Sequence, residues 1–265
     1  ICLKEYVGRF NWNLWDLNTS GMERSFYKNY FKVEKEHWLM VVRRMIARDN
    51  LQTYIDKKPG ETSVLDFGCG SGLFVKELAE HGYRAHGLDI SEEAVKFGLL
   101  QGRESLGVID AHKIDFPDNT FDAVFGMAIL EHLEDESWAL QEIQRVLKPG
   151  GVVIFMVPAY MFLWGVQDET AHHYRRYTKG SLVKKIEAST SMTKVRLSYF
   201  NTFLFLPIAG LRILSRMFGF GITTRESDFD INNPFLNKLF FSIFNAERKL
   251  LSYANFPFGV SILVV

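Results

Sequence analysis

Apolar residues recur at helical spacing in the first part of the chain. Trp38, Val42 and Ile46 lie four residues apart, with arginines at 43 and 44 between them and another at 48 just beyond. This spacing is typical of an amphipathic helix with one buried face, and it predicts a helix from residue 25 to about residue 55. Pro59 and Gly60 predict that the helix has ended before them.

Between residues 63 and 157, short apolar runs alternate with segments of helical spacing. The expected strands cover 63–66, 84–89, 106–110, 121–127 and 152–157, and the expected helices cover 71–81, a segment from 91 onward, and 135–147. Strands that alternate with helices build a parallel sheet with helices on both faces. The chain is therefore predicted to be an α/β protein.

The regular alternation ends after Pro158. We expect a long loop over 159–178, a helix over 178–189, a strand over 194–199 and apolar helical segments over 200–256. These patterns predict four parts, which are an N-terminal helical cap over 1–58, an α/β core over 59–200, a helical insertion over 201–255 and a final core strand over 256–265.

The charge balance argues against a broad nucleic-acid surface. Lysine and arginine together number 31, aspartate and glutamate also number 31, and the formal net charge is zero. A nucleic-acid surface needs clustered positive charge. The two cysteines, Cys2 and Cys69, have neither the spacing of a zinc site nor that of a disulfide framework. Since no signal peptide is visible either, we expect a cytoplasmic protein.

A glycine-rich turn follows the first expected strand. Glycines at 68, 70 and 72 come directly after Asp66 and Phe67. Ligands of open α/β sheets bind beyond the carboxyl ends of the strands, and glycine lets the backbone turn tightly against a ligand. The dinucleotide fingerprint requires a further glycine at position 73, where this chain has Leu73. The turn therefore predicts a nucleotide-like ligand and weighs against NAD.

Acidic residues end the next two expected strands. Asp89 ends the second strand, and Asp110, followed by Ala111, ends the third. Asp89 is placed to accept hydrogen bonds from ribose hydroxyls, and Asp110 to accept one from an adenine amino group. NAD enzymes share the first feature, so Asp89 alone does not distinguish the two cofactors.

Taken in order, these motifs resemble those of the class I S-adenosylmethionine (SAM)-dependent methyltransferases. The matching stretches are Val64–Gly72, Gly87–Ser91, Asp110–Ala111, Phe116–Asp122, Ala128–Leu133 and Arg145–Gly151. The resemblance covers about residues 60–157. It implies a Rossmann-like fold whose seven-stranded, mostly parallel sheet has helices on both faces and a helical insertion before its last strand. It also implies SAM as the methyl donor and S-adenosylhomocysteine as the product.

The resemblance implies cofactor contacts at the ends of four strands. Gly68 and Gly70 would approach the methionine part and the ribose, Asp66 would orient the amino group, Asp89 and Ile90 would hold the ribose and one adenine face, Asp110 and Ala111 would hold the adenine edge, and Met127 would line the sulfonium side. Simpler structural roles remain as alternatives, with Met127 in the core and Asp66 as a cap of the turn.

Two histidines are candidates for catalysis. His132 follows the fourth strand beside Glu131, and His173 lies in the loop after the fifth strand, at the same edge of the sheet. An oxygen acceptor must lose a proton as it takes the methyl group, and a well-placed base accelerates that step. We expect His173 and His132 to be catalytic, with a backbone hydrogen bond as the alternative role of His132.

The loop after the fifth strand also resembles a subgroup of bacterial and archaeal class I methyltransferases with a Trp…Asp…His-x-Arg-Arg-Tyr-Thr pattern. Besides His173, the matching residues are Trp164, Asp168, Arg175, Arg176 and Tyr177. The resemblance implies that they bind the substrate, and it extends to Arg43, which would pair with the methionine carboxylate. Structural ion pairs of the two loop arginines with neighbouring acids are the alternative.

Neither a metal nor a nucleic acid is expected. A Glu131–His132 metal pair, as in some quinone O-methyltransferases, lacks an evident third ligand in the sequence. The Asn-Pro-Pro-aromatic motif of amino-methylating DNA enzymes does not follow the fourth strand. The similar Asn233-Pro234 predicts a helix start instead, with Asn233 as the cap and Pro234 in the first turn.

The apolar run 203–211 is too short to cross a bilayer, which takes ~20 residues. We expect the insertion to be a lid over the site or a dimer surface. The sharper hypothesis is a peripheral membrane contact through 203–220 that admits a lipid-like acceptor.

The predicted function is transfer of a methyl group from SAM to a small-molecule acceptor, and its narrower form is a lipid- or glycan-related acceptor. The alternatives are a SAM-binding protein of the same fold with other or no chemistry, and an NAD-dependent oxidoreductase.

Overall fold

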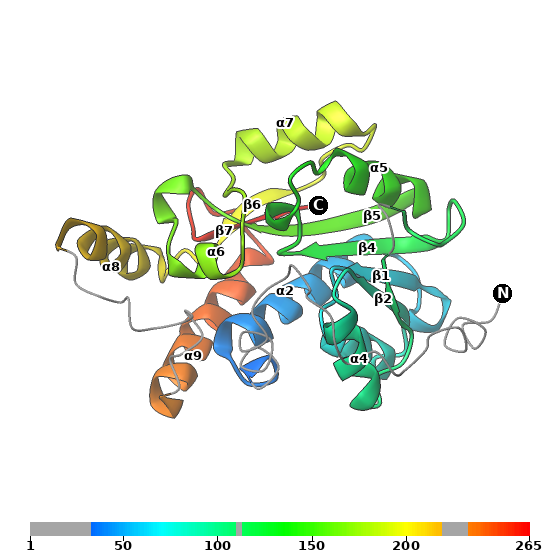
Figure 1. Cartoon of the computed structure of the whole chain (residues 1–265), viewed down its shortest axis with the longest axis horizontal. Helices are drawn as coiled ribbons and strands as arrows, with labels where there is room; N and C mark the ends of the chain where they lie inside the picture. Colours follow the sequence, from blue (N-terminus) through cyan, green and yellow to red (C-terminus); the bar gives the residue numbers. More distant parts are fainter. Residues whose placement is uncertain (1–32, 110–112, 219–232) are drawn as a thin grey trace.

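The computed structural model describes residues 33–109, 113–218 and 233–265. Its centre is a seven-stranded sheet in the order β3-β2-β1-β4-β5-β7-β6 (Figure 1). The strands are β1 (Ser63–Phe67), β2 (Arg84–Asp89), β3 (Leu106–Val108), β4 (Phe121–Met127), β5 (Leu147–Pro158), β6 (Leu197–Phe200) and β7 (Ser261–Val264).

Strands β1 to β5 pair in parallel, while β7 runs antiparallel to both of its neighbours. Strand β7 lies between β5 and β6, although it is the last of the seven in the chain. Its Val264 is opposite Phe155 of β5 on one side and Leu197 of β6 on the other. The predicted Rossmann-like fold, with a mostly parallel sheet of seven strands, is confirmed.

Helices cover both faces of this sheet. They are α2 (Trp38–Tyr54), α3 (Leu73–Glu80), α4 (Glu92–Leu100), α5 (Ser137–Val146), α6 (Val166–Thr170), α7 (Lys179–Ser189), α8 (Phe205–Phe218) and α9 (Pro234–Leu251), with short 3₁₀ turns η3 (Pro59–Glu61), η4 (Leu130–His132) and η5 (Met161–Leu163). Figure 1 shows α5 and α7 above the sheet, with α2, α4 and α9 below it.

Two apolar clusters, one on each face, join the helices to the sheet. Phe74, Phe125 and Phe244 belong to the cluster under α2, α3 and α9, while Leu140 and Leu182 belong to the one under α5 and α7. Alternate residues of β4 explain this division, because successive side chains of a strand point to opposite faces. Val124 lies in one cluster and Phe125 in the other.

The helix starts follow from polar caps in the sequence. Ser91 begins α4 by accepting a hydrogen bond from the backbone N–H of Ala94 (3.1 Å). Asn233 begins α9, its side chain accepts from the N–H groups of Phe235 and Leu236, and Pro234 occupies the first turn. Such caps satisfy N–H groups that the helix itself leaves unpaired. Both expected helix starts are confirmed.

Helices α8 and α9 lie between β6 and β7 in the chain, and α9 packs against α2. Trp38 at the start of α2 makes edge contacts with Phe240 and Phe244, with ring centroids 5.6 and 5.7 Å apart. Its backbone N–H donates to the side chain of Asn237 (2.9 Å). Within the described residues, no helix combines the length and apolar character needed to cross a bilayer.

Several expectations on secondary structure differ from the structure; β5, for example, begins at Leu147 and not at 152, and β7 begins at Ser261 and not at 256. The N-terminal helix, expected from residue 25, begins at Trp38, and residues 25–32 of that prediction lie outside the described residues. The expected loop 159–178 contains η5 and α6. Helix α6 has five residues, which is too short for a helical period to be recognised in the sequence.

Candidate functional site

The glycine turn joins β1 to α3 at the carboxyl edge of the sheet. Gly68, Gly70 and Gly72 have φ angles of 81°, 54° and 76°, a region that residues with a Cβ atom rarely occupy. A Cβ atom on Gly72 would lie 2.4 Å from a methyl carbon of Leu106, and one on Gly68 would lie 2.8 Å from Ile129. The turn therefore requires glycine both for its backbone shape and for the space around it.

Asp89, at the end of β2, forms a hydrogen bond with the glycine turn. Its carboxylate accepts hydrogen bonds from the backbone N–H groups of Gly70 (2.7 Å) and Ser91 (2.8 Å). Burial raises the pKa of Asp89, while these backbone bonds lower it. Ile90 follows with 74% of its side chain exposed. Asp89 and Ile90, the residues expected to contact the ribose and one adenine face, therefore lie next to the glycine turn.

Asp66 lies in β1 just before the turn, and Arg43 of α2 lies near it. Asp66 is almost fully buried, and burial, followed by the charge of Asp89, raises its pKa to about 7. The positive charge of Arg43, on α2, lowers the pKa of Asp66 and also that of Glu131. Arg43 therefore lies near both acids, although it is far from them in the sequence.

The remaining expected cofactor residues have separate outcomes. Met127 ends β4 half-buried and packs against the core, so both of its predicted roles stay open. Asp110 and Ala111 lie outside the described residues, and nothing tests their predicted contact with adenine.

The structure brings three side chains from two separate segments into one cluster. Glu131 and His132 belong to η4, after β4, and His173 belongs to the segment after β5. The rings of His132 and His173 meet edge-on with centroids 4.5 Å apart. The backbone N–H of Tyr174 donates to the carbonyl of Glu131 (2.8 Å), which fixes the two segments to each other. We call these three side chains the Glu–His–His cluster.

Burial disfavours the charged forms of two members of this cluster, Glu131 and His132. Glu131 is 1% exposed, and burial raises the pKa of its carboxyl group. Burial, with a smaller contribution from the charge of His173, lowers the pKa of His132 to about 4. The His132 ring also bonds to the backbone of Ala171. His132 is therefore neutral near pH 7 with one ring nitrogen bonded to the backbone, and both of its predicted roles stay open.

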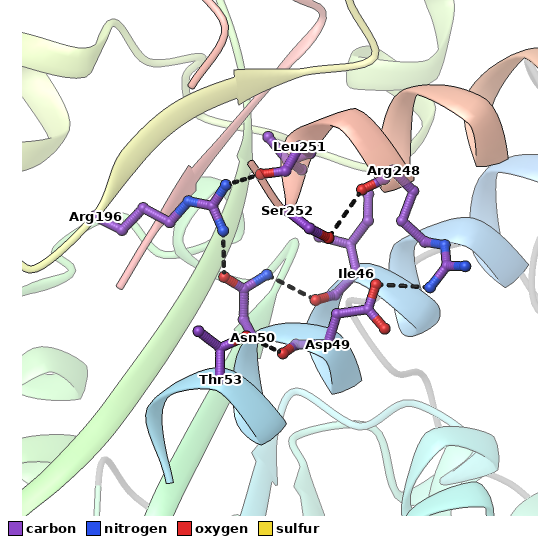
Figure 2. A pocket seen from close by; sticks show the side chains of 8 residues that line it. All are labelled: Ile46, Asp49, Asn50, Thr53, Arg196, Arg248, Leu251 and Ser252. Atoms are coloured by element: carbon purple, nitrogen blue, oxygen red, sulfur yellow. Dashed lines mark hydrogen bonds and ion pairs between the residues drawn. The ribbon is translucent and has the colours of Figure 1, made fainter. Parts of the chain in front are cut away.

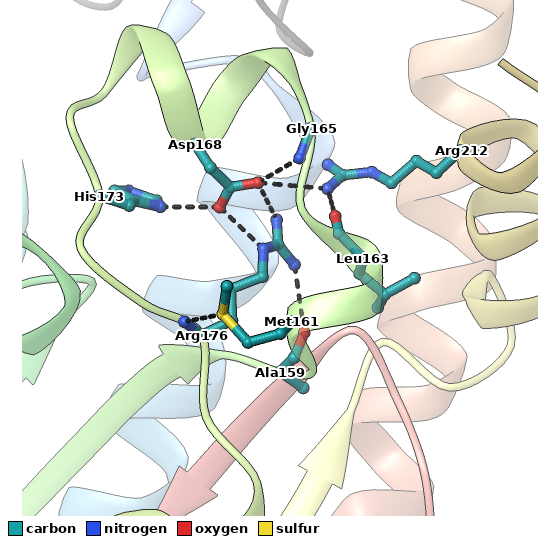
Figure 3. Close-up of polar contacts among 8 residues, drawn as sticks. All are labelled: Ala159, Met161, Leu163, Gly165, Asp168, His173, Arg176 and Arg212. Carbon is teal, nitrogen blue, oxygen red and sulfur yellow. Dashed lines mark hydrogen bonds and ion pairs between the residues drawn. The ribbon is translucent and has the colours of Figure 1, made fainter. Parts of the chain in front are cut away.

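Asp168 contacts the cluster through His173 (Figure 3). Its carboxylate is fully buried and accepts hydrogen bonds from Nδ1 of His173 (2.8 Å), from the guanidinium of Arg176 (2.8 and 2.9 Å) and from the N–H of Gly165 (2.8 Å). Burial alone raises the pKa of Asp168, but the bonds from His173 and Arg176 outweigh burial and hold the pKa at about 2. Asp168 is therefore a charged, fully engaged acceptor.

The other residues of the loop motif have protein partners too. Tyr177 is buried, and its hydroxyl donates to Glu136 (2.9 Å); Arg175 pairs with Glu136 (2.7 Å) and bonds to the carbonyl of Glu134. Trp164 follows η5 and is half-buried. Asp168, Arg176 and Tyr177 are buried, and Asp168 bonds directly to His173, while Trp164 and Arg175 are partly accessible. The substrate contacts expected for these five residues stay a prediction.

Two sets of long-range contacts in this region could not be predicted from the sequence pattern. Arg212 of α8 bonds to the carbonyl of Leu163 and lies 3.4 Å from Asp168. At the glycine turn, Ser71 donates to Glu34 (2.5 Å), and Arg103 pairs with the same glutamate (2.5 Å). Each of these contacts joins segments more than thirty residues apart. They depend on the tertiary fold, which local periodicity does not encode.

A separate pocket lies at the opposite edge of the sheet (Figure 2). It is bordered by the ends of α2 and α9 and by Arg196, which precedes β6. Arg196 donates to Asn50 (3.1 Å), and Arg248 pairs with Asp49 (2.6 Å). These polar groups bond to one another, so the pocket serves the junction of α2 and α9.

Comparison with known proteins agrees with this geometry. Residues 65–155 match the family described as a methyltransferase domain. The chain is 27% identical over 187 residues to the ubiquinone biosynthesis O-methyltransferase of Idiomarina loihiensis, covering 64% of this chain and 71% of that enzyme. It is 34% identical over 105 residues to the 2-methyl-6-phytyl-1,4-hydroquinone methyltransferase of Synechocystis sp., covering 38% of this chain and 33% of that enzyme. It spans 60% of the ubiquinone biosynthesis O-methyltransferase of Vibrio cholerae.

The fold recurs in a solved complex between the Haloferax volcanii Trm112 methyltransferase activator and a methyltransferase. The TM-score is 0.56 at 18% identity, and the alignment covers 91% of this chain and 92% of the other. At this identity the likeness concerns the fold alone. The sheet order, the glycine turn and the family match over 65–155 agree with one another, and the chain carries a class I SAM-dependent methyltransferase domain.

Proposed function

We propose that the protein transfers the methyl group of SAM to an oxygen atom of a small-molecule acceptor. The observation that carries this proposal is the Glu–His–His cluster, which lies at the same edge of the sheet as the glycine turn. SAM supplies an electrophilic methyl group, so the protein must align the acceptor and help its oxygen to lose a proton. A cluster of imidazole and carboxylate groups suits that second task.

The residues around the glycine turn fit SAM. Gly68 and Gly70 offer backbone without side chains, and the carboxylate of Asp89 accepts a hydrogen bond from the N–H of Gly70. Arg43 brings positive charge to the buried acids, where the methionine carboxylate of SAM would lie. Ile90 exposes an apolar surface for the adenine face. Asp66, Asp110, Ala111 and Met127 complete the proposed set.

His173 and His132 are the proposed catalytic residues. Asp168 fixes the ring of His173 through Nδ1, so that Nε2 is available to the acceptor side. Trp164 and Arg175, both partly accessible, are proposed to contact the body of the acceptor, while Asp168, Arg176 and Tyr177 are proposed to shape its site.

The proposed acceptor is lipid-like. Of the relatives named above, one is an O-methyltransferase of ubiquinone biosynthesis and another is a methyltransferase of 2-methyl-6-phytyl-1,4-hydroquinone. The segment after β6 presents apolar side chains to solvent, with Phe203 47%, Leu206 73% and Leu211 58% exposed. A hydroquinone-like acceptor with an apolar tail would place its hydroxyl at the cluster and its tail along this surface, and the surface would rest on a membrane.

Calorimetry and a turnover assay test the proposal. SAM and S-adenosylhomocysteine should bind, and NAD should not. His173→Ala should leave the affinity for S-adenosylhomocysteine unchanged and lower the rate of methyl transfer to a model hydroquinone by about 100-fold, the usual contribution of a group that handles the proton. Binding of NAD without SAM would favour the oxidoreductase, and SAM binding without transfer to any acceptor would favour a binding protein of the same fold.

A further inference from the structure

The Glu–His–His cluster has the composition of a metal-binding site. Glu131, His132 and His173 each offer one ligand atom, and these atoms all lie within 4.8 Å of one another. Two imidazoles and one carboxylate are the protein ligands of many catalytic zinc sites, in which a fourth position stays open for water or substrate. The third ligand that the sequence did not reveal is His173, which is 41 positions away from His132 and adjacent to it in space.

Both histidines are oriented as metal ligands usually are. Nδ1 of His173 lies 2.8 Å from the carboxylate of Asp168, which accepts its hydrogen bond, so Nε2 is the ring nitrogen left with a lone pair for a metal ion. The ring of His132 is held by the backbone of Ala171, which leaves its other ring nitrogen for a ligand bond. A metal-bound histidine typically donates its remaining N–H to a carboxylate or a backbone carbonyl in this way.

Glu131 provides a separate indication of a missing partner. Its Oε2 atom is buried, and no described residue forms a hydrogen bond with it. The residue as a whole is 1% exposed. Buried polar atoms nearly always have a partner, because leaving one unpaired is costly. A bound cation beside the two imidazoles would supply the partner for this oxygen.

We propose that Glu131, His132 and His173 bind a divalent transition-metal ion, with zinc as the best match to the ligand set, and that the ion binds the acceptor oxygen. Imidazole ligands favour zinc and similar ions over magnesium or calcium, which prefer oxygen ligands. The site itself stands on the geometry of the cluster, whereas its role in methyl transfer rests on the function proposed above.

The chemistry balances without any further reactant. A hydroxyl group bound to the ion becomes more acidic and loses its proton to solvent water. The oxygen then forms a bond to the methyl carbon of SAM, the bond from that carbon to sulfur breaks, and its electron pair stays on sulfur. The products are the methyl ether and S-adenosylhomocysteine, and the metal keeps its charge. In this scheme His173 and His132 act by holding the ion.

The test begins with metal binding in the absence of any acceptor. The full chain is stripped with a chelator and titrated with Zn²⁺ by calorimetry, and with Co²⁺ while its visible absorption is recorded. We expect one ion per chain and a Co²⁺ spectrum typical of a site with nitrogen and oxygen ligands. His132→Ala, His173→Ala and Glu131→Gln should each weaken binding at least 100-fold. Asp168→Asn, which releases the ring of His173, should weaken it about 10- to 100-fold.

His172→Ala is the matched control, because His172 is the exposed neighbour of His173 in the same segment. It should bind the ion like the wild type. Binding of S-adenosylhomocysteine by each variant shows that the variant is folded. Absence of stoichiometric binding, or equal affinity in the cluster variants and the control, would overturn the proposal.

A chelation experiment separates this inference from the proposed function. Removing the ion should abolish methyl transfer while SAM still binds, and Zn²⁺ or Co²⁺ should restore it. Transfer that persists after complete removal of the ion would leave the methyltransferase proposal standing and reject the catalytic metal. Tight metal binding without methyl transfer to any acceptor would leave the metal site standing and reject the proposed methyltransferase function.

Discussion

The carboxylate of Asp122, near the start of β4, accepts hydrogen bonds from residues in three parts of the chain. It accepts from Lys57 (2.6 Å), from Lys148 (2.9 Å) and from both the backbone N–H and the hydroxyl of Ser63 (2.9 Å each). The side chain is 4% exposed, although both lysines reach solvent. One carboxylate thus ties β1 and β4 to the segments before and after them.

Replacing Asp122 with alanine should lower the free energy of unfolding at pH 7 by about 2–4 kcal/mol, because several buried hydrogen bonds to a charge are lost. Burial raises the pKa of Asp122, but the lysine and serine donors outweigh it and hold the pKa well below its ordinary range. The stabilisation is therefore complete above the ordinary carboxyl pKa of about 3.9 and declines as the pH falls below it. Urea denaturation at pH 7 and at pH 3 measures both effects.

Asp118→Ala is the control for Asp122→Ala. Asp118 also pairs with an arginine, Arg145, but its side chain is 68% exposed, so its removal should change stability little. Equal losses for the two variants, or a loss for Asp122→Ala that does not shrink at pH 3, would contradict the account.

Asp89→Ala should weaken SAM binding about 10- to 100-fold. The carboxylate both holds Gly70 in the turn and is placed for the ribose hydroxyls, and a hydrogen bond to a charged group contributes ~1.5–3 kcal/mol. Calorimetry with S-adenosylhomocysteine gives the affinity. Glu92→Ala, an exposed acid in the first turn of α4, should bind normally, and an equal loss there would point to a general charge effect.

At the scale of elements, α8 and α9 interrupt the sheet between its last two strands in sequence. Arg212 connects α8 to the loop that holds His173, through Leu163 and Asp168. Among its described side chains, α8 exposes Ile213 (44%) and Leu214 (51%) to solvent. A helix that is tied to the site and also exposes apolar side chains suits an acceptor that arrives from a lipid surface.

The double variant Leu206→Asp, Leu214→Asp should lower co-sedimentation with phosphatidylethanolamine–phosphatidylglycerol vesicles about tenfold or more. Each leucine that enters the interface contributes ~1–2 kcal/mol, and the aspartates also repel anionic lipid. Leu100→Asp is the matched control, because Leu100 is 76% exposed but ends α4. No vesicle binding by the wild type, or equal loss in the control, would reject the membrane contact.

Elements with a clear period were predictable, and those fixed by distant partners were not. The strand–helix alternation and the caps at Ser91 and Asn233 depend on neighbouring residues, so the sequence carried their signal. Helix α6 begins where Gly165 donates to Asp168, and the same Asp168 is held by His173 and Arg176. That arrangement exists only once the loop has packed, so periodicity could not reveal it.

At the scale of the whole molecule, the proposed site is assembled from segments that only the folded chain brings together. Arg43 comes from α2, Asp89 from β2, and His173 from the segment after β5. The sequence motifs could predict a set of cofactor residues because β1, β2 and their turns are local, and that set stays a prediction. His173 lies beside Glu131 and His132 because of the relative positions of β4 and β5, and the order of the motifs alone does not determine those positions.

Because only the folded chain contains this site, S-adenosylhomocysteine should raise the melting temperature. At 100 times its dissociation constant, a ligand that binds the folded state alone adds ~2.7 kcal/mol of stability. For a chain of this size that corresponds to a rise of roughly 5–10 °C. Differential scanning fluorimetry measures the shift. NAD at the same concentration should produce none, and a larger shift with NAD would contradict the assignment of the cofactor.

The position of β7 has a consequence for synthesis on the ribosome. Strand β6 obtains its place in the sheet only through β7, and residues 201–260 separate the two strands. At a translation rate of ~5–20 residues per second, the nascent chain keeps the edge of β5 uncovered for several seconds after β6 has been made. During this interval the apolar α8 and α9 emerge before the sheet can close. Newly made chains should therefore depend on chaperones more strongly at this stage than at any earlier one.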